Sequence, residues 1–123
     1  MPTKVFTLQE ANKRLPLVRK IVEDILQKGQ HLKALQLLNQ TPLVHQQCQN
    51  LITQIEALIS ELEDLGCYFK DWNFEIGLVD FPAQINGENI LFCWKSDEPD
   101  IRWYHNFLDG YHGRALIPQD LLL

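Results

Sequence analysis

The chain has 123 residues, of which 46% are hydrophobic and 22% are charged, and its formal net charge is −5. These proportions are close to the globular average, and no apolar run approaches the roughly 18 residues that span a bilayer, so they exclude a disordered chain and a membrane protein. The acidic balance lacks the clustered Lys and Arg that binding along a nucleic-acid backbone requires. We therefore expect a single domain over residues 1–123, with no nucleic-acid partner and no membrane partner.

The cysteines and the first residues indicate the compartment. Cys48, Cys67 and Cys93 are odd in number and widely spaced, and they form no Cys-x-x-Cys pair. This pattern argues against both a disulfide framework and a zinc site. The start of the chain runs into a helix signal without the apolar stretch of a secretory peptide. We therefore predict a cytoplasmic protein with reduced, mostly buried thiols.

Residues 7–66 carry the pattern of an antiparallel helical hairpin. Thr7 and Glu10 fit a capping box at a helix start. Pro16 cannot donate a main-chain hydrogen bond, so we expect the first helix to stop near Arg14 and a second to begin around Pro16. The apolar residues of that second helix recur at helical spacing and are interrupted near Gly29, which weakens the helix locally.

A further long helix is predicted after a turn at 39–42, in which Thr41 is the N-cap and Pro42 the first helical residue. Its apolar residues alternate at helical-bundle spacing, and Gly66 stands where the residue after a C-cap belongs. A short turn makes two helices antiparallel neighbours. The basic residues that gather before position 36 would then lie beside the acidic end of this helix, which we favour over an anion-binding face.

From residue 67 the composition becomes aromatic and β-branched, which predicts a small antiparallel sheet of three or four strands and an α+β fold. Asn86-Gly87 lies between two alternating apolar runs and is the strongest hairpin signal in the chain. A two-residue turn there places Asp80 opposite Cys93. It also places Phe81 on the face that packs on the helices.

The register of the next strand depends on the turn at 96–99. We expect Lys95 to pair with Asp100, which places Arg102 beside Asp80 on the outer face. Three residues would then lie on the core face: Ile101, Trp103 and His105. A slip of one residue, to which the proline exposes this turn, would exchange the two faces.

The row of Asp80, Cys93 and Arg102 has two interpretations. Arg102 beside Cys93 would lower the pKa of the thiol and make it a nucleophile. A cross-strand ion pair between Asp80 and Arg102 over a small buried cysteine explains the same residues. We favour the ion pair, because no general base is evident.

The C-terminal part contains further candidates. If it coils helically, His105, Asp109 and His112 lie on one face and could bind a divalent metal. Gly110 opposes a regular helix, so we favour a structural, hydrogen-bonded His105 and expect no cofactor. Arg114 could hold a carboxylate or phosphate ligand, or it could cover the sheet edge.

Several short segments occur in a distinctive order along nearly the whole chain: FTLQEAN (6–12), LPL (15–17), GLVDFPA (77–83), LFCW (91–94), EPDI (98–101), WYH (103–105) and GR (113–114). In this order the chain resembles an uncharacterised bacterial family, catalogued as domain of unknown function 2203. The resemblance implies no activity, but it places emphasis on six residues: Asp80, Trp94, Glu98, His105, Gly113 and Arg114. His112 is not among them, which weakens the three-ligand metal set.

Our leading hypothesis from the sequence is a non-enzymatic interaction or assembly module, oligomeric through the wide apolar faces of its helical hairpin, with a second copy or another protein as partner. The chain lacks a Gly-rich phosphate loop, a Gly-x-Ser-x-Gly elbow and a His-Glu-x-x-His helix, so no ordinary enzyme class is indicated. The alternative is a small enzyme or a metal- or anion-binding protein. Its site would lie at the end of the sheet and comprise His105, Arg114, Glu98, Asp80 and Trp103.

Overall fold

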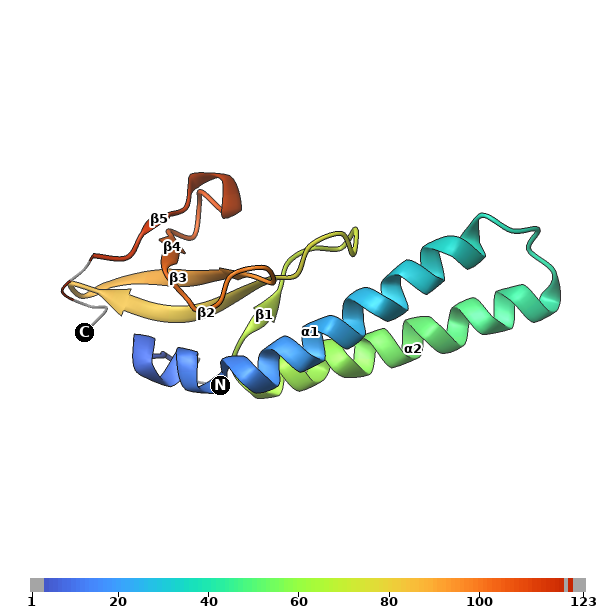
Figure 1. The fold of residues 1–123 in the computed structure, drawn as a ribbon, viewed down its shortest axis with the longest axis horizontal. Coiled ribbons are helices and arrows are strands. Elements are labelled where there is room, and N and C mark those ends of the chain that lie inside the picture. Colours follow the sequence, from blue (N-terminus) through green and yellow to red (C-terminus); the bar gives the residue numbers. More distant parts are fainter. Residues whose placement is uncertain (1–3, 119, 121–123) are drawn as a thin grey trace.

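A helical hairpin precedes a five-stranded antiparallel sheet in the computed structural model of the chain, which describes residues 4–118 and 120 (Figure 1). The helices are α1 (Leu8–Gln36) and α2 (Pro42–Asp64). The strands follow one another in space as they do in the chain: β1 (Tyr68–Phe69), β2 (Leu78–Ile85), β3 (Glu88–Lys95), β4 (Trp103–His105) and β5 (Ala115–Leu116). The predicted α+β fold is confirmed, and the sheet has five strands where the sequence predicts three or four.

Helix α1 begins at the predicted capping box, where Thr7 Oγ1 accepts the N–H of Glu10 at 3.1 Å and the Glu10 carboxylate accepts the N–H of Thr7 at 3.2 Å. The predicted break at Pro16 is wrong, because α1 continues through it. Pro16 is exposed, whereas Leu15 and Val18 on either side of it are buried in the core. Burying two such side chains contributes about 3–6 kcal/mol, which offsets the roughly 3 kcal/mol that an internal proline costs.

Helix α1 also continues through Gly29, where the sequence predicts an interruption, and the Phe74 side chain packs against it there. A Cβ atom at this position would lie only 2.1 Å from Cγ of Phe74. Gly29 is itself buried in α1, and the Phe74 ring lies directly against it. The residue that weakens the helix intrinsically therefore lets the loop before β2 approach it closely.

Helix α2 begins and ends as predicted. Thr41 Oγ1 accepts the N–H of Val44 at 3.2 Å, and Pro42 is the first helical residue. At the other end Gly66 has a φ of +92°, and its N–H and that of Cys67 bond back to the carbonyls of Glu63 and Leu62. This Schellman motif turns the chain from α2 into β1.

One face of the sheet packs on the helices, and the C-terminal segment lies on the opposite side of the sheet (Figure 1). The Asn86-Gly87 hairpin has the predicted register, with Phe81 opposite Phe92 and Asp80 opposite Cys93. The side chains that form this face are fully or almost fully buried: Val79, Phe81, Ala83, Ile90, Phe92 and Trp94. The helical hairpin extends well beyond the sheet, so the sheet does not cover its tip (Figure 1).

The predicted register of β4 is wrong by one residue. Trp103 lies opposite Cys93, and His105 lies opposite Leu91. Residues 96–102 take no part in the pairing of β3 with β4, because other hydrogen bonds hold them. The Glu98 carboxylate accepts the Lys95 N–H at 2.7 Å, and the Ile101 N–H donates to Asn12 Oδ1 at 2.9 Å. The correction moves two residues that we had placed on the core face, Trp103 and His105, to the outer face of the sheet. Ile101 is buried in the core as predicted.

Candidate functional site

Three polar or reactive side chains converge on the outer face of the sheet: Asp80 from β2, Cys93 from β3 and His105 from β4. Asp80 and Cys93 are directly opposite one another, and His105 lies two positions from the Trp103 that opposes Cys93. The atoms that could bind a cation all lie within 4.8 Å of one another. Asp80 and His105 are each 4% exposed and Cys93 is 1% exposed, so the cluster is buried beneath the C-terminal segment.

Hydrogen bonds fix the orientation of the His105 ring. Its Nδ1 lies 2.7 Å from the carbonyl oxygen of Asn106, and its Nε2 lies 3.1 Å from Oδ1 of Asp80. The carbonyl can only accept, so Nδ1 carries a proton. The contact on the other side requires one further proton, shared between Nε2 and the carboxylate. Lys70 approaches the second carboxylate oxygen, with Nζ 4.0 Å from Oδ2.

Burial dominates the acidity of the cluster. It raises the pKa of Asp80, although His105 and Lys70 favour the ionised carboxylate. Burial also raises the pKa of Cys93 to about 12, and the neighbouring Asp80 acts in the same direction while Arg114 opposes it. With the cluster as described, Cys93 is therefore a protonated thiol at neutral pH.

The geometry does not favour Cys93 as a nucleophile. The predicted row with Arg102 is not formed, because Arg102 Nε bonds to Oδ1 of Asp100 at 2.6 Å and its side chain is 60% exposed. His105 lies close to Cys93, but both of its ring nitrogens already have hydrogen-bond partners. A cysteine nucleophile needs a lowered pKa or a free base, and Cys93 has neither.

A second group from the predicted site forms a brace beside the cluster. Arg114 makes a bidentate ion pair with Glu98, at 3.0 and 2.9 Å, and both side chains are less than 20% exposed (14% and 17%). The guanidinium also lies 4.6 Å from the ring centre of Trp103 and 4.7 Å from that of Tyr111. These contacts tie the turn before β4 to the short 3-10 helix Tyr111–Gly113. Of the two alternatives for Arg114, the structure thus favours the covering role.

The three residues of the predicted metal set do not come together. Of His105, Asp109 and His112, only His105 belongs to the buried cluster, and the other two are exposed. Residues 107–110 form a turn rather than a helix, and Gly110 has a φ of +63°. Asn106 Oδ1 caps this turn by accepting the N–H groups of residues 108 and 109. The helical spacing on which the set depended is therefore absent from this segment.

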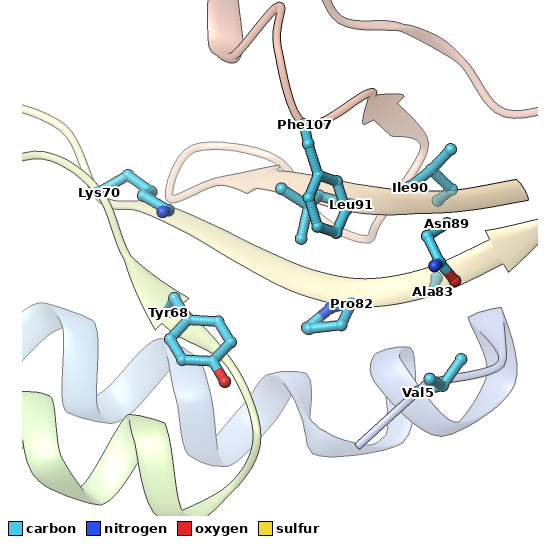
Figure 2. Close-up of a pocket in the computed structure, with 9 residues that line it drawn as sticks. All are labelled: Val5, Tyr68, Lys70, Pro82, Ala83, Asn89, Ile90, Leu91 and Phe107. Carbon is cyan, nitrogen blue, oxygen red and sulfur yellow. The ribbon is translucent and has the colours of Figure 1, made fainter. Parts of the chain in front are cut away.

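Two adjoining cavities open on the outer face of the sheet. The smaller one, of about 260 Å³, has the three cluster residues in its wall, together with Lys70, Leu91, Phe107 and Tyr111 among others. The larger one, of about 570 Å³, shares Lys70, Leu91 and Phe107 with it. Figure 2 shows the residues that line this larger cavity, with Phe107 and Leu91 on one side of Pro82 and with Tyr68 and Val5 on the other. Sequence reasoning missed Lys70, Phe107 and the joining of Cys93 with His105, since these depend on the β4 register and on the path of the covering loop.

Comparison with known proteins adds a family and nothing further. A family model described as "Uncharacterized conserved protein (DUF2203)" matches residues 4–117. No curated protein and no solved structure matches the chain.

Proposed function

We propose that this chain, which belongs to the uncharacterised conserved protein family DUF2203, binds a small organic molecule in the groove on the outer face of its sheet. The ligand has an apolar body and one anionic group. The observation that carries this proposal is the sharing of Lys70, Leu91 and Phe107 by the two cavities, which joins an apolar groove to a buried polar cluster. Pockets of this kind, mostly apolar with a few convergent polar groups, are typical of small-molecule sites.

The apolar part of the groove fits an organic body. Pro82, Leu91 and Phe107 line it, and the Phe107 side chain remains 64% exposed. A large exposed aromatic side chain beside a cavity gains burial when a ligand fills that cavity. Covering it contributes about 25 cal/mol per Å² of apolar surface.

The polar part favours a negatively charged group on the ligand. Lys70 lines both cavities, its side chain is 52% exposed, and its nearest carboxylate oxygen is 4.0 Å away. At that distance and exposure the contact with Asp80 is weak, so the ammonium is free to bind a stronger partner. A carboxylate or phosphate at the junction of the two cavities would supply one.

A thermal-shift screen of small carboxylates and phosphates tests the proposal. Compounds that raise the melting temperature of the wild-type protein should lose most of that effect in Phe107→Ala and in Lys70→Gln. The matched controls are Leu108→Ala, at a neighbouring side chain that is 93% exposed, and Lys13→Gln on the exposed face of α1. The proposal is wrong if no compound shifts the wild-type protein, or if the shifts persist in both groove variants.

The assembly hypothesis stays a prediction, and one observation favours it. Leu37, Leu38 and Leu43 at the tip of the hairpin are 89%, 53% and 68% exposed, and they lie beyond the reach of the sheet (Figure 1). A second copy could cover these residues by an isologous contact between two tips. Sedimentation at micromolar concentration should show a dimer that Leu37→Ser with Leu43→Ser dissociates. A monomeric wild type, with no partner recovered by crosslinking in cells, would end this hypothesis.

A cytoplasmic location is likewise our proposal. None of the helices in the described part of the chain combines the length and apolar character that crossing a bilayer requires. All three cysteines are free and buried, as is usual in a reducing compartment. Localisation of a tagged copy by cell fractionation tests the proposal.

A further inference from the structure

The buried cluster of Asp80, Cys93 and His105 combines three different metal-binding groups. A carboxylate, a thiol and an imidazole come from three neighbouring strands, all nearly inaccessible to solvent. A carboxylate and an imidazole are seldom buried unless they are paired or bind a metal, whereas a buried thiol is common by itself. Here the thiol lies within 4.8 Å of the ligand atoms of the other two, so all three could bind one ion.

The spacing of the three groups suits a tetrahedral ion. Metal–ligand bonds of about 2.0 Å to oxygen or nitrogen and 2.3 Å to sulfur place neighbouring ligand atoms roughly 3.3–3.6 Å apart. The atoms of the cluster lie within 4.8 Å of one another, and the carboxylate–imidazole distance is already 3.1 Å. Small changes in the side-chain torsion angles would therefore bring the three ligand atoms to the distances of a tetrahedral site.

The orientation of His105 has the form of a metal-binding histidine. Its Nδ1–H donates to a backbone carbonyl, that of Asn106, so Nε2 points towards Asp80 and can offer its lone pair to an ion that displaces the proton shared with the carboxylate. Metal-binding histidines almost always hold their second ring nitrogen in this way, because the bond fixes both the tautomer and the direction of the ring.

We propose that Asp80, Cys93 and His105 bind a single Zn²⁺ ion, whose fourth position faces the smaller cavity. A mixed N, S and O donor set suits Zn²⁺ and excludes Mg²⁺ and Ca²⁺, which take oxygen ligands. Three protein ligands with one open position are typical of zinc sites that receive a further ligand. This proposal differs from the expectation, drawn from the spacing of the cysteines, that the chain has no zinc site.

The charges and protons of this site balance. Coordination requires the thiolate and the carboxylate, whose negative charges together neutralise the dication within the buried site. Binding releases to solvent the thiol proton of Cys93 and the proton shared by Asp80 and His105, while Nδ1 keeps its own. No oxidant or other reactant is involved.

The zinc ion would also define the polar end of the groove. The cavity in front of the cluster is lined by Lys70 and Tyr111, and it adjoins the apolar groove. The anionic group of an organic ligand could then occupy the fourth position of the ion. In this respect alone the inference rests on the proposed function; metal binding itself does not require the organic ligand.

Metal titration of the untagged, chelator-treated full chain tests the proposal. Zn²⁺ should bind with one ion per chain, and Co²⁺ should give the near-ultraviolet thiolate charge-transfer band and the intense visible bands of a tetrahedral site. Cys93→Ser should abolish the charge-transfer band. His105→Gln should weaken Zn²⁺ binding by more than the roughly 10–100-fold that loss of a supporting residue causes.

Two controls distinguish this site from other cysteines and histidines. Cys48→Ala, in α2, and His112→Gln, at an exposed position, should leave the spectrum and the affinity unchanged. Circular dichroism establishes whether Cys93→Ser is folded, and the thiolate charge-transfer band of the wild-type protein with Co²⁺ gives a readout that needs no variant. Failure to take up Zn²⁺, uptake that Cys93→Ser leaves intact, or a spectrum without the thiolate band would each overturn the assignment.

The Phe107→Ala variant separates this inference from the proposed function. It should lose the organic ligand and still bind Zn²⁺ with the wild-type affinity. If organic compounds bind to a protein that takes up no metal, the zinc site is wrong and the groove stands. If Zn²⁺ binds and no compound does, the groove proposal is wrong and the metal site stands.

Discussion

His105 Nε2 lies 3.1 Å from Asp80 Oδ1, although the two residues are 25 positions apart in the chain. The two side chains meet because β2, β3 and β4 are adjacent and the register of β4 places His105 on the outer face. Both side chains are buried, so each provides the other with a hydrogen-bond partner that water cannot supply there. The stability of the sheet and the chemistry of the cavity thus depend on the same contact.

The destabilisation caused by removing Asp80 and that caused by removing His105 should not be additive. In chelator, we expect Asp80→Ala and His105→Ala each to lower the free energy of unfolding by about 3 kcal/mol, since each leaves its partner buried and unpaired. The double variant should cost less than the sum of the two, with a coupling of about 0.5–3 kcal/mol. Urea denaturation of the four proteins measures this cycle, and strictly additive effects would show that the contact contributes nothing.

Gly29 provides a prediction whose sign depends on a second residue. Gly29→Ala brings a Cβ atom to 2.1 Å from Cγ of Phe74, which should destabilise the protein by about 1–3 kcal/mol. Phe74 has a φ of +57°, so Phe74→Gly relieves the backbone and removes the ring. In that background Gly29→Ala should stabilise the helix by up to about 1 kcal/mol, the ordinary preference for alanine. Thermal unfolding of the four proteins checks the change of sign.

The elements with local causes could be predicted from the sequence. The hairpin register follows from Asn86 and Gly87 alone, whose φ values of +53° and +81° suit the two-residue turn. The start and end of α2 likewise depend on Thr41 and Gly66, which act within a few residues. Such features were predicted correctly, because no distant contact competes with them.

The errors fall where distant contacts decide. The carbonyl of Glu98 accepts bonds from the Trp94 indole and from Arg19, which is 79 positions away, and Ile101 is bonded to Asn12 across 89 positions. These bonds shift β4 by one residue, and the shift converts a core histidine into a member of the outer-face cluster. The position of His105 therefore could not be derived from local pattern, although its residue type had marked it as a candidate.

Cys67 should be unreactive in the native protein and should make stability depend on pH at the alkaline end. Burial raises the pKa of its thiol to about 12, against 9.0 for an ordinary cysteine. Between these values the unfolded chain loses the proton and the folded chain keeps it, so the free energy of unfolding should fall as pH rises above 9, by at most about 1.4 kcal/mol per pH unit. Below pH 9 this contribution is fully present.

The comparison of wild type with Cys67→Ala isolates this effect from other alkaline titrations. The difference in stability between the two proteins should shrink as pH rises from 8 towards 11 in urea denaturation. Iodoacetamide at pH 8 should leave Cys67 unmodified in the native state and modify it in urea, as mass spectrometry would show. Rapid native labelling of Cys67 would contradict the burial of this thiol.

The brace between Arg114 and Glu98 should depend on guanidinium geometry as well as charge. Arg114→Lys keeps the charge but loses the bidentate pairing at 2.9 and 3.0 Å and the contacts with Trp103 and Tyr111, so we expect a loss of about 1–2 kcal/mol in the free energy of unfolding. Arg114→Ala should cost more, about 3 kcal/mol, because it leaves the Glu98 carboxylate without its cation.

Arg102 is the matched control for this prediction, since its guanidinium also contacts both carboxylate oxygens of an aspartate, Asp100, at 2.6 and 3.3 Å. That pair is exposed, with 60% and 42% of the two side chains accessible, whereas the Arg114 pair is less than 20% exposed (14% and 17%). Water and salt screen the exposed pair, so Arg102→Lys should change stability by less than about 0.5 kcal/mol. Urea denaturation of both variants, at low and high salt, measures the contrast. Equal losses at the two positions would mean that burial does not strengthen the brace, and that the C-terminal segment is held over the cavity mainly by its other contacts.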